Sequence, residues 1–340
     1  MDKKLILAVA GAGKTTYIIN NVKYGKRTLI LTYTDANYEN IIQKIRIENN
    51  GVIPDNVTVF TYFGFLYQFC YKPFLADIYL AQGISFEVNK NKYVRQNDIK
   101  YFMDQHNRFY SNRFAFFFEK CGIIDDIIRR IEKYFDVFII DEIQDLSGRD
   151  FNFLEKMMSA KVDIMFVGDF NQHTYSTSFD GNVNQSLFDD ISQYKKRFEK
   201  KGIVIDEELL QKSWRCGEQV CEFIRKCLQI EIYSNVGTTG DISFIVDESK
   251  IEEILNDDDI VKLHYQKAAG YGANHRNWGE TKGEDCYQDV CVLLNKTTLT
   301  KYKKGELSAL PATTKNKLYV ALTRAKGNVY LIDEACLKYK

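Results

Sequence analysis

A glycine-rich segment near the start of the chain has the residue types of a phosphate-binding loop. Residues 8–15 are Ala-Val-Ala-Gly-Ala-Gly-Lys-Thr, directly after an apolar run. Small residues let consecutive backbone N–H groups approach phosphate oxygens, while the lysine reaches the β- and γ-phosphates and the next hydroxyl binds Mg²⁺. Because Ala8 stands where the general pattern has glycine, a tight turn with a solvated lysine is the alternative. The residues predicted to bind the nucleotide are Ala10, Gly11, Ala12, Gly13, Lys14, Thr15 and Thr16.

Two further strand-like runs end in side chains that suit nucleotide hydrolysis. Residues 135–140 lead into Asp141, which can hold Mg²⁺ through water, and Glu142, which can act as general base on the attacking water. Residues 162–167 precede Gln172, whose amide can orient that water and sense the γ-phosphate. Taken singly, an acid after a strand is more commonly a helix cap. The three strand ends together predict hydrolysis of a nucleoside triphosphate.

Two arginines in the second half of the chain are candidates for charge stabilisation. Arg215 and Arg324 carry guanidinium groups that can neutralise charge developing on a γ-phosphate. In enzymes that use this device it is worth on the order of 10³–10⁵ in rate. A single arginine is more commonly part of a surface ion pair, so the assignment of both as catalytic residues depends on the family resemblance of their surroundings.

Apolar runs alternate with helical patterns along the chain. This alternation predicts an α/β fold with parallel sheets and helices on both faces. The aromatic-rich residues 67–132 predict a mostly helical insertion, and the charged residues 194–202 mark a hinge. We therefore expect two α/β domains, residues 1–200 and 201–340. The predicted strands are residues 4–10, 28–32, 57–61, 135–140, 162–167, 203–206, 242–246, 260–263, 290–294 and 329–332.

The composition excludes several classes of protein. Lys and Arg total 46 and Asp and Glu total 46 in 340 residues, so any phosphate backbone must be bound by local patches. Three prolines leave no room for a proline-rich linker, and the longest apolar runs are too short to span a bilayer. With no signal peptide and no Cys-x-x-Cys pair, the eight cysteines favour a cytosolic protein with reduced thiols. The alternative is a metal site built from two equally spaced pairs, Cys216 with Cys221 and Cys286 with Cys291.

In this order, the motifs resemble the signature motifs of the UvrD/Rep-type superfamily 1 DNA helicases and translocases. The resemblance extends from residue 8 to residue 326, nearly the whole chain. It includes an Asp-Glu-x-Gln-Asp box and a Gly-Asp-x-x-Gln-x-x-Tyr motif. The matching segments are residues 8–15, 31–35, 61–65, 141–145, 168–175, 213–216, 281–285 and 320–325.

The resemblance implies two RecA-like P-loop NTPase domains, each an α/β domain with a parallel sheet flanked by helices, and a short helical insertion in the first. It implies ATP bound between them with Mg²⁺ held by Thr15 and Asp141. Trp214 stands where the family has a tyrosine that stacks on adenine, and Gly283 and Asp285 lie in a further nucleotide motif. Single-stranded DNA, with RNA as the alternative, would contact Tyr33, Thr34, Thr61, Phe63 and Trp278.

The function implied is an ATP-dependent single-stranded DNA translocase or helicase that moves 3′→5′, the motor subunit of a DNA repair or antiphage complex with a nuclease or other protein partner. Two departures from the family point to a compact motor. Residues 176–181 lack the usual aromatic–Arg-Gly-Ala string, and too few residues separate Arg215 from Lys282 for the large accessory subdomain. The alternative function is a nucleotide-switched, DNA-binding regulatory subunit of a nuclease system that does not unwind DNA.

Overall fold

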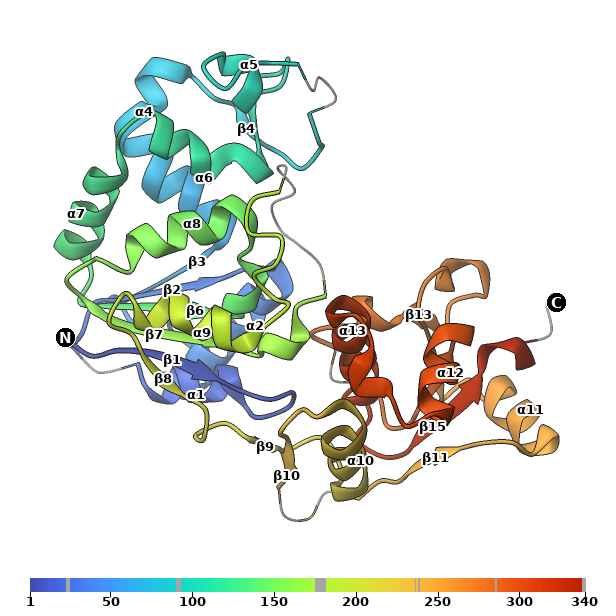
Figure 1. Cartoon of the computed structure of the whole chain (residues 1–340). Coiled ribbons are helices and arrows are strands. Elements are labelled where there is room, and N and C mark those ends of the chain that lie inside the picture. The colour runs from blue at the N-terminus through green and yellow to red at the C-terminus, as the bar shows by residue number, and fades with distance from the viewer. Residues whose placement is uncertain are drawn as a thin grey trace. The chain divides into compact units, whose positions relative to one another are not determined.

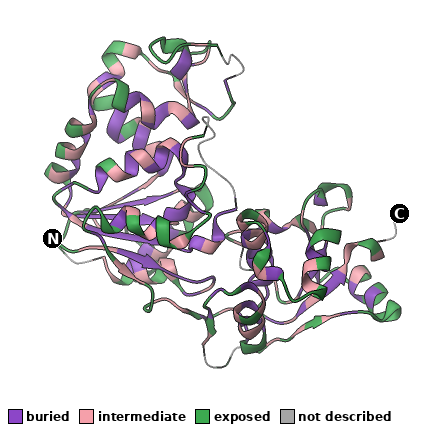
Figure 2. Ribbon diagram, viewed as in Figure 1, coloured by how far each residue is buried: buried purple, intermediate pink, exposed green. Residues whose placement is uncertain are grey.

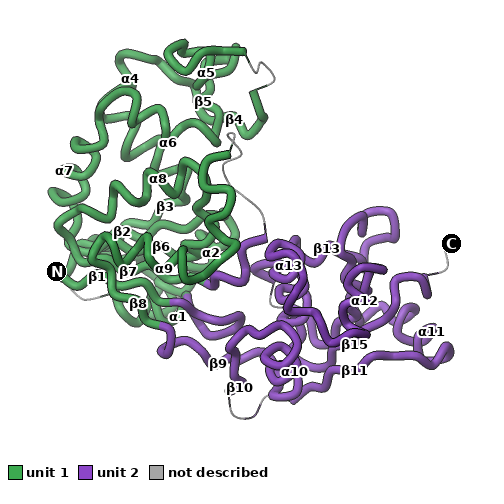
Figure 3. The backbone as a smooth tube through the Cα atoms, in the orientation of Figure 1, with its two compact units in different colours: residues 1–6, 15–168, 176–206 green, residues 7–14, 169–175, 207–340 purple. Residues whose placement is uncertain are grey.

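Two parallel β-sheets organise the chain, one in each of two units. The computed structural model describes residues 1–22, 25–89, 93–174, 182–235, 237, 239–284 and 286–337. The first unit comprises residues 1–6, 15–168 and 176–206, and the second comprises residues 7–14, 169–175 and 207–340 (Figure 3). The predicted fold class, α/β with parallel sheets flanked by helices, is confirmed.

The first sheet has six strands that run parallel. β2 and β6 are buried along their whole length (Figure 2), because a parallel sheet with helices on both faces leaves neither side of a central strand in water. The predicted bounds of β2 and β3 are confirmed. In spatial order the strands are β3 (Val57–Thr61), β2 (Thr28–Thr32), β6 (Val137–Asp141), β7 (Asp163–Gly168), β1 (Lys3–Leu7) and β8 (Val204–Asp206).

The edge strand β8 comes from a segment that the sequence analysis assigned to the second domain. It pairs with β1 in parallel register, with Lys4 opposite Val204 and Ile6 opposite Asp206. These backbone hydrogen bonds hold β8 in the first sheet. The last segment of the first unit therefore ends at residue 206 rather than at residue 200, and residues 7–14 and 169–175 belong to the second unit.

Four helices of the first unit follow strands of this sheet or precede them. α2 begins at Thr34, whose hydroxyl accepts the N–H of Asn37 at 3.1 Å and so caps the helix. Its buried face, Ile41, Ile42 and Ile45, has the spacing of one helix side. The four helices are α1 (Lys14–Asn20), α2 (Asp35–Glu48), α8 (Gly148–Met157) and α9 (Ile191–Glu199).

The aromatic-rich insertion between β3 and β6 forms its own small core. Figure 1 shows its helices α4, α5 and α6 lying together beside β4. The rings of Phe109 and Phe114 stack at 4.3 Å between centroids, and Phe118 contacts Phe153 of α8 at 5.9 Å. The parallel pair β4 (Gly83–Ser85) and β5 (Arg108–Tyr110) was not predicted. The helices are α3 (Tyr62–Gly64), α4 (Lys72–Tyr79), α5 (Ile99–Phe102), α6 (Ser111–Lys120) and α7 (Ile124–Tyr134), with a wide helical turn at Phe65–Tyr71.

The second unit contains a five-stranded parallel sheet and a two-stranded one. The order in the larger sheet is β11 (Ile242–Phe244), β15 (Val329–Asp333), β14 (Val290–Leu294), β12 (Val261–His264) and β13 (His275–Asn277). The smaller sheet pairs β9 (Lys212–Ser213) with β10 (Tyr233–Ser234). The helices are α10 (Glu218–Phe223), α11 (Glu248–Asn256), α12 (Lys296–Lys303) and α13 (Ala312–Leu322). Within the described ranges, no helix is both long and apolar enough to cross a membrane.

The core of the second unit includes the glycine-rich loop that follows β1. Ala8, Val9, Ala10 and Ala12 are buried in one apolar cluster with residues of β12, β14 and α13. Ala8 is 5% exposed, so the alanine that replaces the usual glycine packs as a small core side chain. The loop is therefore held by hydrophobic burial as well as by its backbone.

A pair of histidines, of which His264 is buried and His275 half-buried, joins two neighbouring strands of the second sheet. Nε2 of His264 in β12 lies 2.7 Å from Nδ1 of His275 in β13. Burial, together with the neighbouring His275 imidazole, lowers the pKa of His264 to about 4. The pair is thus neutral near pH 7 and shares one proton as a structural hydrogen bond.

The cysteines do not gather into one site. All eight are free thiols. Cys216 and Cys221 lie in the main core of the second unit, Cys291 lies in a separate cluster with Ile332, and Cys286 is exposed. Within the residues that the structure describes, no group of three or more His, Cys, Asp or Glu side chains could hold a metal ion.

The cap of α10 allows a test of packing in the second unit. A Cβ on Gly217 would lie 2.8 Å from the carbonyl oxygen and 3.0 Å from the nitrogen of Gly240. Because these are backbone atoms, we expect Gly217→Ala to lower the free energy of unfolding by about 1–3 kcal/mol in urea denaturation. Gly270→Ala is the control, since its Cβ would meet nothing within 4 Å, and its effect should stay within about 0.5 kcal/mol. Equal stability of the two variants would contradict the close approach.

Candidate functional site

Most of the predicted site residues follow the carboxyl ends of strands in the first sheet. Lys14 follows β1, Thr34 follows β2, Phe63 follows β3, Glu142 follows β6 and Gln172 follows β7. Since parallel strands end at a common edge, this is the edge at which open α/β sheets bind their ligands.

The glycine-rich loop packs directly against the segment that carries Arg215, within the second unit. The backbone N–H of Trp214 donates to the carbonyl of Gly11 at 2.9 Å. A Cβ on Gly11 would lie 2.7 Å from the Ser213 hydroxyl oxygen and 2.8 Å from Cβ of Arg215, and its φ is +71°. Gly13 also has a positive φ, +80°. Glycine is thus needed here for conformation and for space, and the packing brings Arg215 beside the loop that bears Lys14.

The backbone amide of Ala10 has a protein partner. It donates to the Tyr319 hydroxyl at 3.0 Å, and the Val9 amide donates to the Leu210 carbonyl at 2.9 Å. Ala10 is fully buried. The prediction that Ala10 contacts the nucleotide is therefore corrected, because its N–H is used to anchor the loop.

The acidic pair at the end of β6 is held by short-range hydrogen bonds. Oδ1 of the buried Asp141 accepts the backbone N–H of Glu142 at 3.0 Å. Glu142 has a left-handed backbone with φ 54°, a strained conformation that clusters at functional sites. Its carboxylate accepts a hydrogen bond from the Gln144 amide, which is completely buried. The acid thus has a fixed orientation.

Gln144 is a site residue that the sequence analysis missed. A Cβ at Gly168 would lie 2.3 Å from its Oε1 and 2.7 Å from a methyl carbon of Ile143. The glycine at the end of β7 therefore provides the space in which Gln144 holds Glu142. Gln144 could have been noticed as the glutamine of the Asp-Glu-x-Gln-Asp box, but only the fold shows that its partner is Glu142.

Gln172 is buried and attached to Asp169. Its amide nitrogen donates to Oδ2 of Asp169 at 3.0 Å, and both residues are at most 3% exposed. The Tyr319 hydroxyl donates to the same oxygen at 3.0 Å. The predicted water-orienting residue is thus fixed within the second unit. Tyr175, the motif's last residue, lies outside the described residues.

The two candidate arginines have different environments. Arg215 is half-buried and donates to the Thr323 carbonyl at 3.0 Å. Arg324 is 1% exposed, and its guanidinium donates to the carbonyls of Val320, Thr281 and Glu284 at 3.1, 3.1 and 3.2 Å. Arg324 is therefore fixed inside the second unit.

The turn that carries Gly283 surrounds Arg324. Gly283 has φ +88°, and the carbonyls on both sides of it, those of Thr281 and Glu284, accept from the arginine. This part of the predicted nucleotide motif thus positions a guanidinium in the structure. Asp285 lies outside the described residues.

Trp214 lies beside the glycine-rich loop with most of its surface in water. Its side chain is 68% exposed, and its Cδ1 is 4.0 Å from where a Cβ of Gly13 would lie. Thr16 is also exposed, and its hydroxyl accepts a hydrogen bond from the Lys44 ammonium at 3.2 Å. An exposed indole at this place offers a flat apolar face to a ligand.

Aromatic side chains continue from the ends of β2 and β3. The ring centroids of Tyr33 and Phe63 are 5.7 Å apart, and those of Phe63 and Phe86 are 5.0 Å apart. Phe63 is 9% exposed, whereas Phe86, just after β4, is 70% exposed. Phe86 was not predicted as a site residue, because a single phenylalanine in an insertion has no distinguishing pattern in the sequence. Thr61 caps the turn that carries Phe63 by accepting the N–H of Gly64 at 3.2 Å.

Trp278 is a core residue. It is completely buried, and its indole N–H donates to the Leu263 carbonyl at 2.9 Å. A base cannot stack on a ring with no exposed surface. The prediction that Trp278 contacts nucleic acid is therefore corrected.

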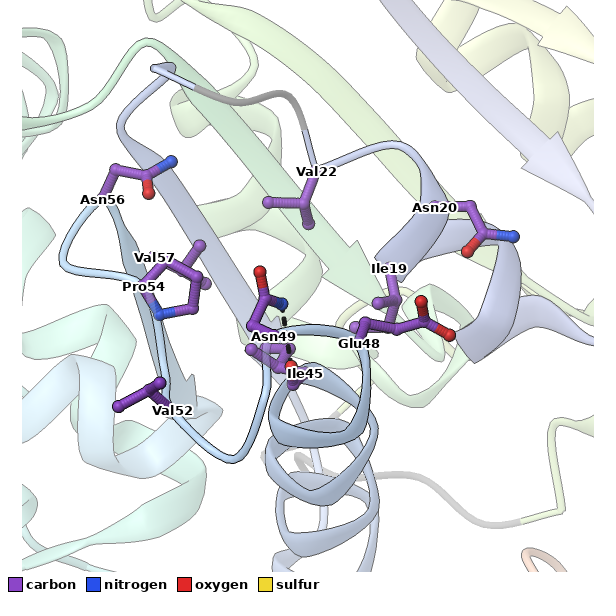
Figure 4. Close-up of a pocket in the computed structure, with 10 residues that line it drawn as sticks. All are labelled: Ile19, Asn20, Val22, Ile45, Glu48, Asn49, Val52, Pro54, Asn56 and Val57. Atoms are coloured by element: carbon purple, nitrogen blue, oxygen red, sulfur yellow. Dashed lines mark hydrogen bonds between the residues drawn. The ribbon is translucent and has the colours of Figure 1, made fainter.

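The first unit contains a cavity of about 600 Å³ (Figure 4). Its lining includes the last residues of α1 and α2, Asn20 and Glu48, and the first residue of β3, Val57. It is thus at the amino-terminal edge of the sheet, opposite the edge from which the candidate site residues emerge.

Two family models match the chain. Residues 2–178 match a family model described as an AAA domain, and residues 119–333 match one described as the viral superfamily 1 RNA helicase core domain. The sequence matches none of the curated proteins.

Two solved structures of arterivirus nonstructural protein 10, a helicase, have a similar fold. The complex with DNA has a TM-score of 0.52 and 15% identity, covering 99% of this chain and 63% of that one. The second crystal structure has a TM-score of 0.52 and 16% identity, covering 99% and 62%. The present chain thus spans less than two thirds of those helicase chains, and at this identity the likeness concerns the fold.

The contrast between the two arginines generates a stability prediction. Arg324→Ala would leave three buried carbonyls without this donor, at about 1–3 kcal/mol for each lost partner. We expect its free energy of unfolding to fall by at least about 3 kcal/mol in urea denaturation. Arg215→Ala, at a half-buried position, should lose about 1 kcal/mol. If Arg324→Ala is no less stable than Arg215→Ala, Arg324 is not fixed as described.

Proposed function

Because the chain belongs to the superfamily 1 helicases, we propose that it is an ATP-dependent translocase of the UvrD/Rep type that moves 3′→5′ on single-stranded DNA. The observation that carries the proposal is the packing of Gly11 against Ser213 and Arg215, which places an arginine beside the loop that bears Lys14. The motif strand ends support it, since Glu142 and Gln172 follow neighbouring strands β6 and β7.

The residues present fit ATP with Mg²⁺. The Thr15 hydroxyl and the Asp141 carboxylate are hard oxygen ligands of the kind that Mg²⁺ prefers, and Lys14 and Arg215 supply positive charge for phosphates. The absence of a larger metal cluster among the described residues is compatible, because Mg²⁺ bound with a nucleotide needs one or two protein ligands. When bound, Mg²⁺ would neutralise charge on the β- and γ-phosphate oxygens.

Each side chain of the candidate site has a proposed role in ATP binding or hydrolysis. Glu142 takes a proton from the attacking water, and Gln144 holds its carboxylate in place. Gln172 orients the same water. Arg215 stabilises charge on the transferred phosphoryl group, while Arg324 contributes positive charge from its buried position. Trp214 offers its exposed face to the nucleotide base.

The single strand is proposed to contact the aromatic residues beyond β2 and β3. Aromatic faces stack on any base, so they suit a motor that must not depend on sequence. Tyr33 and Phe63 form the base of this surface, Phe86 provides its exposed ring, and the hydroxyls of Thr34 and Thr61 lie at the same strand ends. RNA is the competing substrate, because one matching family model is that of viral RNA helicases.

ATP turnover with and without single-stranded nucleic acid tests the function. We expect stimulation by a poly-dT strand, and a smaller effect of poly-U. Lys14→Ala should lose nucleotide binding and turnover together, whereas Glu142→Gln should bind a fluorescent ATP analogue normally and hydrolyse about 10²–10⁴-fold more slowly.

Glu252→Gln, an exposed acid on α11, is the matched control and should hydrolyse like the unmodified chain. Normal turnover by Glu142→Gln would overturn its assignment as the base. A folded chain that hydrolyses ATP without any response to nucleic acid would overturn the motor. ATP-dependent DNA binding without strand displacement or movement would favour the regulatory subunit.

The exposed ring of Phe86 generates a prediction for strand binding. Base–aromatic stacking is worth about 1–3 kcal/mol, so Phe86→Ala should weaken binding of a labelled single-stranded oligonucleotide about 5- to 150-fold in fluorescence anisotropy. The loss should be similar for dT and dA strands. Tyr134→Ala, which removes an exposed ring at the end of α7, should bind as before. Equal affinity of the two variants would exclude Phe86 from the strand's path.

A further inference from the structure

One tyrosine hydroxyl in the second unit joins two separate motifs. Tyr319 lies in the carboxyl-terminal half of α13 and has no exposed surface. Its hydroxyl accepts the backbone N–H of Ala10 at 3.0 Å and donates to Oδ2 of Asp169 at 3.0 Å. Ala10 and Asp169 are 309 and 150 residues away from it in the chain. The glycine-rich loop and the segment that carries Gln172 are thus connected through a single oxygen atom.

Asp169 is the branch point of this network. Its Oδ1 accepts the N–H of Asn171 at 3.0 Å, and its Oδ2 accepts both the Gln172 amide and the Tyr319 hydroxyl at 3.0 Å. The carboxylate is 1% exposed, and a buried carboxylate is stable only when such donors surround it. The same oxygen atom therefore fixes the amide of Gln172 and the hydroxyl of Tyr319.

The direction of the hydrogen bonds is determined by protonation. Burial raises the pKa of the Tyr319 hydroxyl well above its usual value, and the Asp169 charge raises it further. The hydroxyl accordingly keeps its proton and donates it to Asp169, while its lone pair accepts from Ala10. Hydrogen bonds in such a chain strengthen one another in a buried setting.

We propose that Tyr319 is a positioning residue that keeps the glycine-rich loop and the Gln172 amide at a fixed spacing. The inference rests on the proposed ATP hydrolysis, in which the loop holds the phosphates and Gln172 orients the attacking water. Misplacement of a reacting group lowers the rate even when the ligand still binds. The hydroxyl of Tyr319, whose partners are the Ala10 amide and the Asp169 carboxylate, thus acts on turnover through Gln172.

Tyr319→Phe tests the role, because it removes one oxygen atom and keeps the ring. The matched control is Tyr71→Phe in the insertion, where a tyrosine that is 1% exposed accepts the backbone N–H of Ala81 at 2.8 Å. Tyr319→Phe should lose more thermal stability than Tyr71→Phe, because it removes two hydrogen bonds, one of them to a buried carboxylate. Tyr319→Phe should lower kcat about 10- to 100-fold, the range expected for a lost hydrogen bond to a charged group, with KM for ATP nearly unchanged. Tyr71→Phe should keep kcat.

A double-mutant cycle with Gln172→Ala separates positioning from general destabilisation. If Tyr319 acts through Gln172, adding Tyr319→Phe to Gln172→Ala should lower kcat less than about twofold further. Asp169→Asn alters the same branch point, so adding it to Gln172→Ala should also lower kcat by less than the product of the two separate losses. The positioning role would be overturned if the loss of kcat in the double variant equals the product of the two separate losses. It would also be overturned if Tyr319→Phe leaves kcat unchanged.

Hydrogen exchange of the backbone amides gives a readout that needs neither nucleotide nor turnover. Exchange at Ala10 should accelerate in Tyr319→Phe and stay slow in Tyr71→Phe. Equal exchange in both variants would overturn the network. A folded chain that shows this acceleration but hydrolyses no ATP would instead overturn the proposed function, so the two failures are distinguishable.

Discussion

The close approach of the glycine-rich loop to the segment 213–215 constrains the rest of the candidate site. The approach is possible because Gly11 has no side chain and a φ of +71°, while the Trp214 N–H satisfies its carbonyl. Hydrophobic burial of Ala8, Val9 and Ala12 then fixes the loop in the core of the second unit. A phosphate-binding loop must present its backbone, so its side chains have to be small and its anchoring has to come from elsewhere. Here the anchors are this core and the hydroxyl of Tyr319.

Buried polar groups give the site its rigidity. Asp169, Gln172 and Arg324 are each at most 3% exposed, and in such positions a polar group is tolerated only with partners. Their described partners are backbone groups, the Tyr319 hydroxyl and one another, so a rotation of Asp169 or Arg324 would break several hydrogen bonds. This explains why Arg324 and Arg215 cannot be treated as equivalent cations. Arg215 keeps part of its surface in water, whereas the Arg324 guanidinium is buried and donates hydrogen bonds to three backbone carbonyls.

The bounds of the central strands were predicted more accurately from the sequence than the partners of individual side chains. The strands Thr28–Thr32, Val57–Thr61 and Val290–Leu294 have their predicted bounds, since a central parallel strand is a continuous apolar run that local pattern alone reveals. The positions of the site residues at strand ends were predicted for the same reason. β8 was misplaced, because a short edge strand acquires its sheet through pairing with β1, far away in the chain. Gln144 and Tyr319 were missed because their roles depend on partners that only folding brings near.

The two tryptophans of the chain have opposite environments, which the sequence did not distinguish. Both were expected to present a ring to a ligand, yet Trp278 is completely buried and Trp214 is 68% exposed. Burial of an indole is favourable and its N–H is easily satisfied by a carbonyl, so the core position of Trp278 needs no ligand to explain it. Trp214 differs from it, because its ring forgoes that gain and leaves its apolar face accessible to a ligand. Its position beside Gly13 therefore supports a role at the nucleotide more strongly than its place in the sequence does.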